Sequence, residues 1–70
     1  MQETVNSATD ATDRAMAFVK KYRMIARPLK AVRQDGNWLV EVDVGPIFVQ
    51  VAKVKIDASS GDVVEYAFPG

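Results

Sequence analysis

The chain has 70 residues, with no cysteine and no histidine, and its nine cations balance its nine acids to a net charge of zero. A chain of this length forms one small domain, and without cysteine it has neither disulfides nor thiolate metal sites. Because the commonest general base and the most nucleophilic side chain are also absent, we expect no enzyme, no catalytic residue, no cofactor and no metal site.

The first residues are polar, and we expect residues 1–6 to be disordered. The start Met1-Gln2-Glu3-Thr4 lacks the basic and apolar regions of a signal peptide. The compartment stays open: cytoplasmic if Met1 is the native start, and envelope or exported if a leader was removed. Apolar runs fall short of the ~20 residues that cross a bilayer, so we expect no transmembrane segment.

A helical period begins near Ser7 and is predicted to continue to Ala26. Apolar residues recur at steps of mostly three and four, which predicts one buried stripe. Its members are Ala8, Ala11, Ala15, Phe18, Val19, Tyr22 and Ile25. Ser7 is the predicted N-cap, and Pro28 forces the preceding residue out of the α region. The sequence therefore predicts one helix that ends just before Pro28.

Four strands are predicted to follow. Residues 29–34 suit an edge strand, and Asp35-Gly36-Asn37 predicts a tight hairpin turn. A second strand starts at Trp38, Gly45-Pro46 interrupts it, and a long third strand is predicted to start at Ile47. A turn at Asp57–Asp62, with Gly61 at positive φ, leads to the fourth strand. We predict an α+β fold, with an N-terminal helix packed on a four-stranded antiparallel meander (α-β-β-β-β).

The two faces of this sheet are predicted to differ. One face carries residues that alternate along the second and third strands and should pack on the helix: Trp38, Val40, Val42, Val44, Ala52, Val54 and Ile56. Four other apolar residues should then face away with nothing to cover them: Leu39, Ile47, Val49 and Val51. An exposed apolar cluster favours an interaction surface, and we expect a homodimer or an unidentified protein partner there. The alternative is that a strongly twisted hairpin curls these residues over its own helix.

Two acidic patterns could suggest a metal ion. Glu41 and Asp43 share a strand face, but two neighbouring carboxylates are more typical of a solvated face than of a metal site. The Asp57–Asp62 stretch has its glycine at the fifth position, whereas an EF-hand loop needs it at the sixth. We interpret both as ordinary structure.

A cationic segment gives an alternative function. The candidate phosphate contacts are Lys20, Lys21, Arg23, Arg27, Lys30 and Arg33. Such a run can follow a nucleic-acid backbone, but a nucleic-acid domain is usually basic as a whole and this chain is neutral. Tyr22, the possible stacking residue, also falls on the predicted buried stripe. We therefore do not favour nucleic acid as the partner.

The stretch Val54-Lys55-Ile56-Asp57-Ala58-Ser59-Ser60-Gly61-Asp62-Val63-Val64 resembles the closing hairpin of PepSY domains. The earlier strand Trp38-Leu39-Val40-Glu41-Val42 fits the same family, which would make residues 1–70 a single PepSY-like domain. The stretch Asp-Gly-x-Trp-x-Val-Glu-Val is also distantly similar to a gas-vesicle accessory family. The PepSY resemblance implies a non-catalytic module that regulates a partner. We thus expect a small protein-interaction or regulatory module that self-associates through the outer sheet face, with nucleic-acid binding as the alternative.

Overall fold

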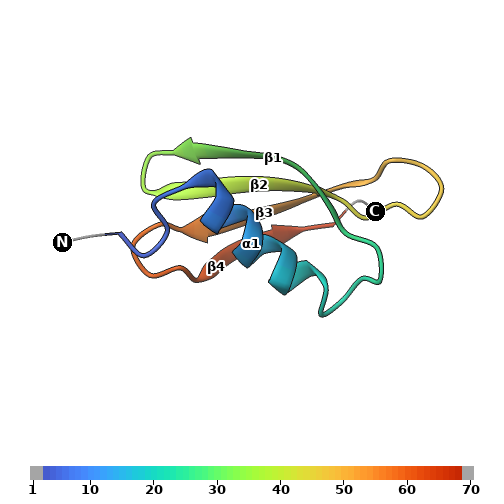
Figure 1. Ribbon diagram of the computed structural model, residues 1–70, viewed down its shortest axis with the longest axis horizontal. Helices are drawn as coiled ribbons and strands as arrows, with labels where there is room; N and C mark the ends of the chain where they lie inside the picture. Colours follow the sequence, from blue (N-terminus) through green and yellow to red (C-terminus); the bar gives the residue numbers. More distant parts are fainter. Residues whose placement is uncertain (1–2, 69–70) are drawn as a thin grey trace.

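The computed structural model describes residues 3–68 and confirms the predicted α-β-β-β-β order. One helix, α1 (Ala8–Val19), lies across one face of a four-stranded antiparallel sheet (Figure 1). The strands are β1 (Arg27–Gln34), β2 (Asn37–Asp43), β3 (Val51–Asp57) and β4 (Val63–Ala67), and they neighbour each other in chain order. The molecule is elongated, with extents of 42 × 19 × 18 Å. Within residues 3–68, no helix is long and apolar enough to cross a membrane.

Helix α1 begins as predicted but ends early. The Ser7 hydroxyl oxygen accepts a hydrogen bond from the Asp10 amide at 3.1 Å, which caps the first turn. The helix ends at Val19 rather than Ala26, because the amides of Lys21 and Tyr22 turn to carbonyls three residues back. Residues 20–26 form the connection to β1. The prediction that Tyr22 lies on a buried helical stripe is therefore wrong, since its side chain is exposed.

The inward face of the sheet is the predicted one. Across β2 and β3, Trp38 pairs with Ile56, Val40 with Val54 and Val42 with Ala52. All six are buried, together with Val44. Helix α1 contributes three buried residues spaced four apart: Ala11, Ala15 and Val19. Small alanines at this contact let the helix backbone approach the valine-rich sheet closely.

The segment before α1 is ordered, contrary to the expected disorder of residues 1–6. Val5 is fully buried, and its amide donates to the Ala58 carbonyl oxygen at 2.9 Å. The Trp38 Nε1–H donates to the Val5 carbonyl oxygen at 2.9 Å. Residues 3–6 therefore belong to the packed domain, whereas residues 1–2 of that prediction lie outside the described part of the chain.

Each edge strand carries a register shift. In β1 the pairing with β2 skips Leu29, between Pro28 and Lys30. In β4 the pairing with β3 passes from Val63 to Glu65, which leaves Val64 as the extra residue. Strand β1 begins at Arg27, two residues before the predicted start, and includes a proline that an edge strand tolerates.

Candidate interaction surface

The four predicted interface residues do not form one sheet face. Leu39 on β2 and Val51 at the start of β3 are half-buried. Ile47 and Val49 are exposed, but they lie in the loop between β2 and β3, because β3 starts at Val51 and not at Ile47. Their exposure agrees with the expectation that nothing covers them. The predicted strand from Ile47 to Gln50 is wrong.

The outer face of the sheet is mainly polar. Lys30 on β1 pairs with Glu41 on β2 at 3.5 Å, and Lys55 on β3 pairs with Glu65 on β4 at 3.7 Å. Next to both ion pairs, Val32 lies opposite Leu39, which in turn lies opposite Lys55. The apolar part of this face is therefore a narrow strip, and the largest exposed apolar side chains lie elsewhere.

The loop of residues 44–50 is organised around the Asp43 carboxylate. Only 5% of Asp43 is exposed, so the prediction of a solvated outer-face carboxylate is wrong for this residue. Its Oδ1 accepts hydrogen bonds from the amides of Gly45 at 2.9 Å and Gln50 at 3.1 Å. Its Oδ2 accepts from the Arg27 guanidinium at 3.1 Å, which also donates to the Gly45 carbonyl oxygen. These bonds, with the Gly45 amide the largest contribution, hold the pKa of Asp43 below its usual value.

Glycine is required at the base of this loop. A Cβ on Gly45 would lie 1.6 Å from the Phe48 carbonyl oxygen, so the two arms of the loop touch there. The Val44 amide also donates to the Gln50 carbonyl oxygen at 2.9 Å. The loop is thus closed by backbone contacts and by one buried carboxylate, while its tip projects outward.

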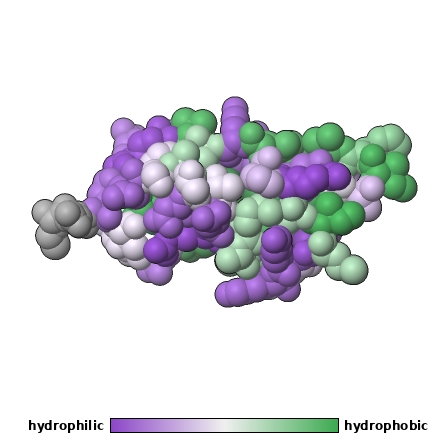
Figure 2. All heavy atoms as spheres, viewed as in Figure 1, coloured by the Kyte–Doolittle hydropathy of each residue, from purple (hydrophilic) through white to green (hydrophobic). Residues whose placement is uncertain are grey.

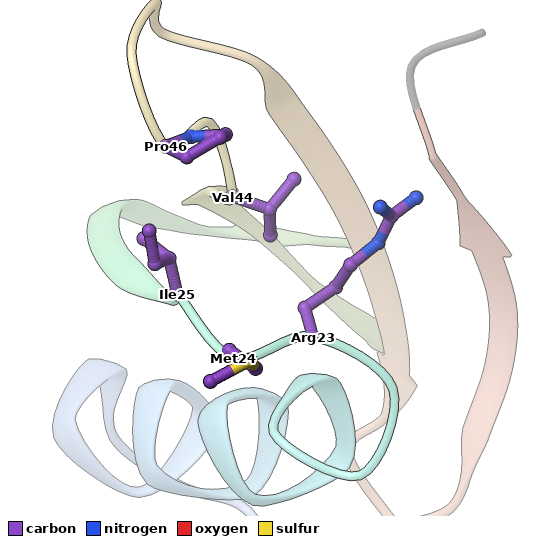
Figure 3. A pocket seen from close by; sticks show the side chains of 5 residues that line it. All are labelled: Arg23, Met24, Ile25, Val44 and Pro46. Atoms are coloured by element: carbon purple, nitrogen blue, oxygen red, sulfur yellow. The ribbon is translucent and has the colours of Figure 1, made fainter.

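The tip of this loop and the α1–β1 connection form an apolar end, defined here as Met24, Ile47, Phe48 and Val49. Their exposed fractions are 102%, 84%, 78% and 69%. An open pocket of about 260 Å³ joins the two loops, with Arg23, Met24 and Ile25 on one side and Val44 and Pro46 on the other (Figure 3). Figure 2 shows hydrophobic residues gathered at the end of the molecule where the β2–β3 loop projects in Figure 1. Sequence reasoning missed Phe48 and Met24 because neither fitted the alternation on which the interface prediction depended.

The six predicted phosphate contacts separate into two groups. Arg27, Lys30 and Arg33 pair with Asp43, Glu41 and Glu3 respectively. Lys20, Lys21 and Arg23 lie at the end of α1 and in the connection after it. The Arg23 guanidinium lies 4.2 Å from the centroid of the Phe68 ring, a cation–π arrangement. The structure therefore pairs Arg27, Lys30 and Arg33 with acids and sets Arg23 against an aromatic ring. Lys20 and Lys21 are exposed between α1 and β1.

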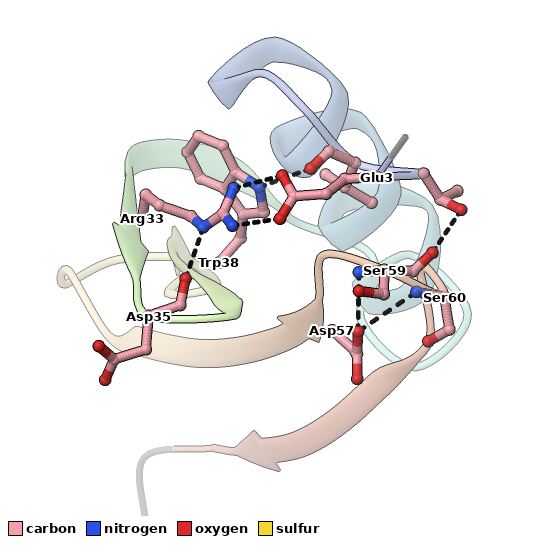
Figure 4. Close-up of polar contacts among 9 residues, drawn as sticks. Glu3, Arg33, Asp35, Trp38, Asp57, Ser59 and Ser60 are labelled. Carbon is pink, nitrogen blue, oxygen red and sulfur yellow. Dashed lines mark hydrogen bonds and ion pairs between the residues drawn. The ribbon is translucent and has the colours of Figure 1, made fainter. Parts of the chain in front are cut away.

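The end of the molecule opposite the β2–β3 loop contains the β3–β4 turn and an ion pair between Glu3 and Arg33 (Figure 4). The Asp57 carboxylate accepts from the amides of Ser59 at 2.8 Å and Ser60 at 3.2 Å, and Gly61 has a φ of 82°, which confirms the predicted turn. The Arg33 guanidinium donates to the Glu3 carboxylate, with Nη1 to Oε1 at 2.7 Å. That bond lowers the pKa of Glu3 and raises the pKa of Arg33. Among residues 3–68, no group of three or more His, Cys, Asp or Glu side chains could hold a metal ion.

An aromatic cluster lies where the last turn of α1 meets β4. Phe18 packs edge-on against Tyr66 at 4.7 Å between ring centroids, and Tyr66 against Phe68 at 4.0 Å. Tyr22 joins from the connection after α1, 5.3 Å from Phe18. Burial raises the pKa of Tyr66. The cluster extends the core under β4 and holds the α1–β1 connection near the sheet.

No protein-family profile, curated protein or solved structure matches this chain.

Proposed function

We propose that this protein is a small non-catalytic interaction module that docks through its apolar end. The observation that carries the proposal is the run Ile47-Phe48-Val49, three consecutive exposed apolar residues on a loop closed by the buried Asp43 carboxylate. An exposed apolar cluster on a small protein marks an interaction site, and a braced loop presents it without further ordering. The resemblance to PepSY domains agrees with a binding role without catalysis.

This proposal moves the contact surface from the outer sheet face to the loop. The outer face offers Val32 and Leu39 beside two ion pairs, whereas the apolar end offers four largely exposed side chains. At high protein concentration, exposed apolar side chains of different molecules also contact each other. Weak self-association therefore shows which surface makes contacts.

Sedimentation velocity over a series of concentrations tests the proposal. We expect Phe48→Ser to lower self-association and Val32→Ser to leave it unchanged. Both positions are exposed, so neither variant should unfold, and circular dichroism checks this. Self-association that persists in Phe48→Ser but falls in Val32→Ser would return the contact to the outer sheet face.

Nucleic-acid binding stays the second candidate because Tyr22 is exposed between Lys21 and Arg23. A stacking surface beside cations is what single-stranded nucleic acids use. Titration with single-stranded and duplex DNA at several salt concentrations tests it. Salt-dependent binding that Lys20→Glu with Arg23→Glu abolishes, and that Phe48→Ser leaves intact, would replace the apolar-end proposal.

A further inference from the structure

We infer that the apolar end docks on the surface of an anionic lipid bilayer, with the tip of the β2–β3 loop inserted among the lipids. This inference rests on the proposed function and names the class of its partner. Three features carry it: the shape of the end, the bracing of the loop and the distribution of charge along the molecule.

The shape of the end suits a deformable partner. Ile47, Phe48 and Val49 project from a narrow hairpin tip at one end of a molecule 42 Å long and 19 Å wide. A specific protein–protein interface typically buries about 800 Å² per partner over roughly 20–30 residues a side. The apolar end supplies three exposed apolar side chains on the projecting loop tip and a fourth, Met24, on the α1–β1 connection. A bilayer closes around such a tip, whereas a protein partner would need a matching cavity.

The bracing of the loop keeps these side chains from collapsing onto the protein. The Asp43 carboxylate holds the amides of Gly45 and Gln50, and Arg27 ties the Gly45 carbonyl oxygen to the same carboxylate. The loop is therefore ordered before it meets a partner, and insertion costs little additional conformational entropy.

The charge distribution orients the apolar end towards anionic lipids. The α1–β1 connection, which carries Lys20, Lys21 and Arg23, lies at the same end of the molecule as the tip of the β2–β3 loop (Figure 1). Neither residues 20–26 nor residues 44–50 contain an acid. The turn acids Asp35, Asp57 and Asp62 belong to the turns at the opposite end. The protein is neutral as a whole but polarised along its length, so an anionic surface attracts one end and repels the other. Long lysine and arginine stems also reach the headgroups while the tip lies deeper.

Co-sedimentation with vesicles tests the inference, using phosphatidylcholine alone and phosphatidylcholine mixed with phosphatidylserine. We expect the protein to bind the mixed vesicles about tenfold more tightly than vesicles of phosphatidylcholine alone, because attraction between its cations and an anionic surface adds to the affinity. Phe48→Ser should weaken binding by about tenfold, the loss expected when one aromatic side chain no longer enters the apolar layer. Val32→Ser should change it by less than about twofold. Lys20→Gln with Lys21→Gln should weaken binding at low salt more than at high salt.

The outcomes separate this inference from the function on which it rests. Absent binding to mixed vesicles, or equal binding to both kinds, overturns the lipid partner. If Phe48→Ser also abolishes self-association in that case, the apolar end remains a docking surface and its occupant is a second copy or another protein. If Phe48→Ser changes neither assay, both the lipid partner and the apolar-end proposal fail.

Discussion

The Trp38 indole nitrogen lies 2.9 Å from the Val5 carbonyl oxygen and donates a hydrogen bond to it. This bond joins the segment that precedes α1 to the second strand, and both residues are buried. The sequence gap between them is large, so the contact forms only when the N-terminal segment closes over that end of the sheet. It accounts for the order of residues 3–6.

We expect Trp38→Phe to lower the free energy of unfolding by about 1–3 kcal/mol, because it leaves the buried Val5 carbonyl oxygen without its donor. Urea unfolding followed by circular dichroism measures this loss. Tyr22→Phe, at an exposed aromatic residue, serves as the control and should stay within about 0.5 kcal/mol of the wild type. Equal stability of the two variants would show that the hydrogen bond contributes little.

Ile56 and Ile47 give a matched pair of substitution sites, because one is buried and the other is exposed. Ile56 on β3 is fully buried in the core, whereas Ile47 is 84% exposed. We expect Ile56→Val to cost about 0.5–1.5 kcal/mol of stability through the lost methylene and the cavity it leaves. Ile47→Val should change stability by less than about 0.5 kcal/mol. Thermal unfolding of both variants compares them, and an equal loss would contradict the loop placement of Ile47.

The loop of residues 44–50 predicts a difference between two glycines. Gly45→Ala places a methyl group against the Phe48 carbonyl, so the loop must open, and we expect a loss of more than about 1 kcal/mol. Gly36→Ala is the control, since nothing lies within 4 Å of the added methyl group, and it should stay within about 0.5 kcal/mol. If Gly45→Ala unfolds at the same urea concentration as Gly36→Ala, the two loop arms are not in contact.

Acid should remove the contribution of Asp43 to stability. Its pKa is lowered in the folded state, chiefly by the Gly45 and Gln50 amides, so folding favours the ionised carboxylate. That stability is fully present above the ordinary pKa of 3.8 and is lost as the pH falls through the lower folded value. Wild type should therefore melt at a higher temperature than Asp43→Asn at pH 7, and the gap should narrow below pH 3.8. Melting curves across this pH range measure the difference in melting temperature between the two proteins. The titration of Glu3 affects both proteins equally and cancels in that difference. A difference that does not change with pH would contradict the lowered pKa of Asp43.

The strand alternation made the central sheet predictable, because residues 38–44 and 52–56 have one buried face each. The same alternation predicted a strand at Ile47 to Gln50, where the structure has a loop. A side-chain period does not show that the Asp43 carboxylate accepts hydrogen bonds from the Gly45 and Gln50 amides. The helical period overran at Tyr22 because a residue in the following turn can still rest on Phe18. Val5 gave no signal, because one apolar residue in a polar segment has no period.

The candidate surface was predicted in part. Ile47 and Val49 were identified as uncovered by elimination, since nothing in the chain was left to pack on them. Their gathering with Met24 depends on where two loops from distant parts of the sequence meet, which no local pattern encodes. The conformation of the β2–β3 loop depends on Asp43. Its burial could not be predicted, because polar and apolar residues alternate around it as they do in a strand with one solvent-exposed face.

The skipped residues Leu29 and Val64 interrupt the two rims of the sheet. A kinked rim gives an incoming chain no straight ladder of backbone donors and acceptors to extend, so fibre-like growth through the strands is disfavoured. Because stacking along its flanks is disfavoured, this small domain can expose an apolar tip at one pole without growing into fibres.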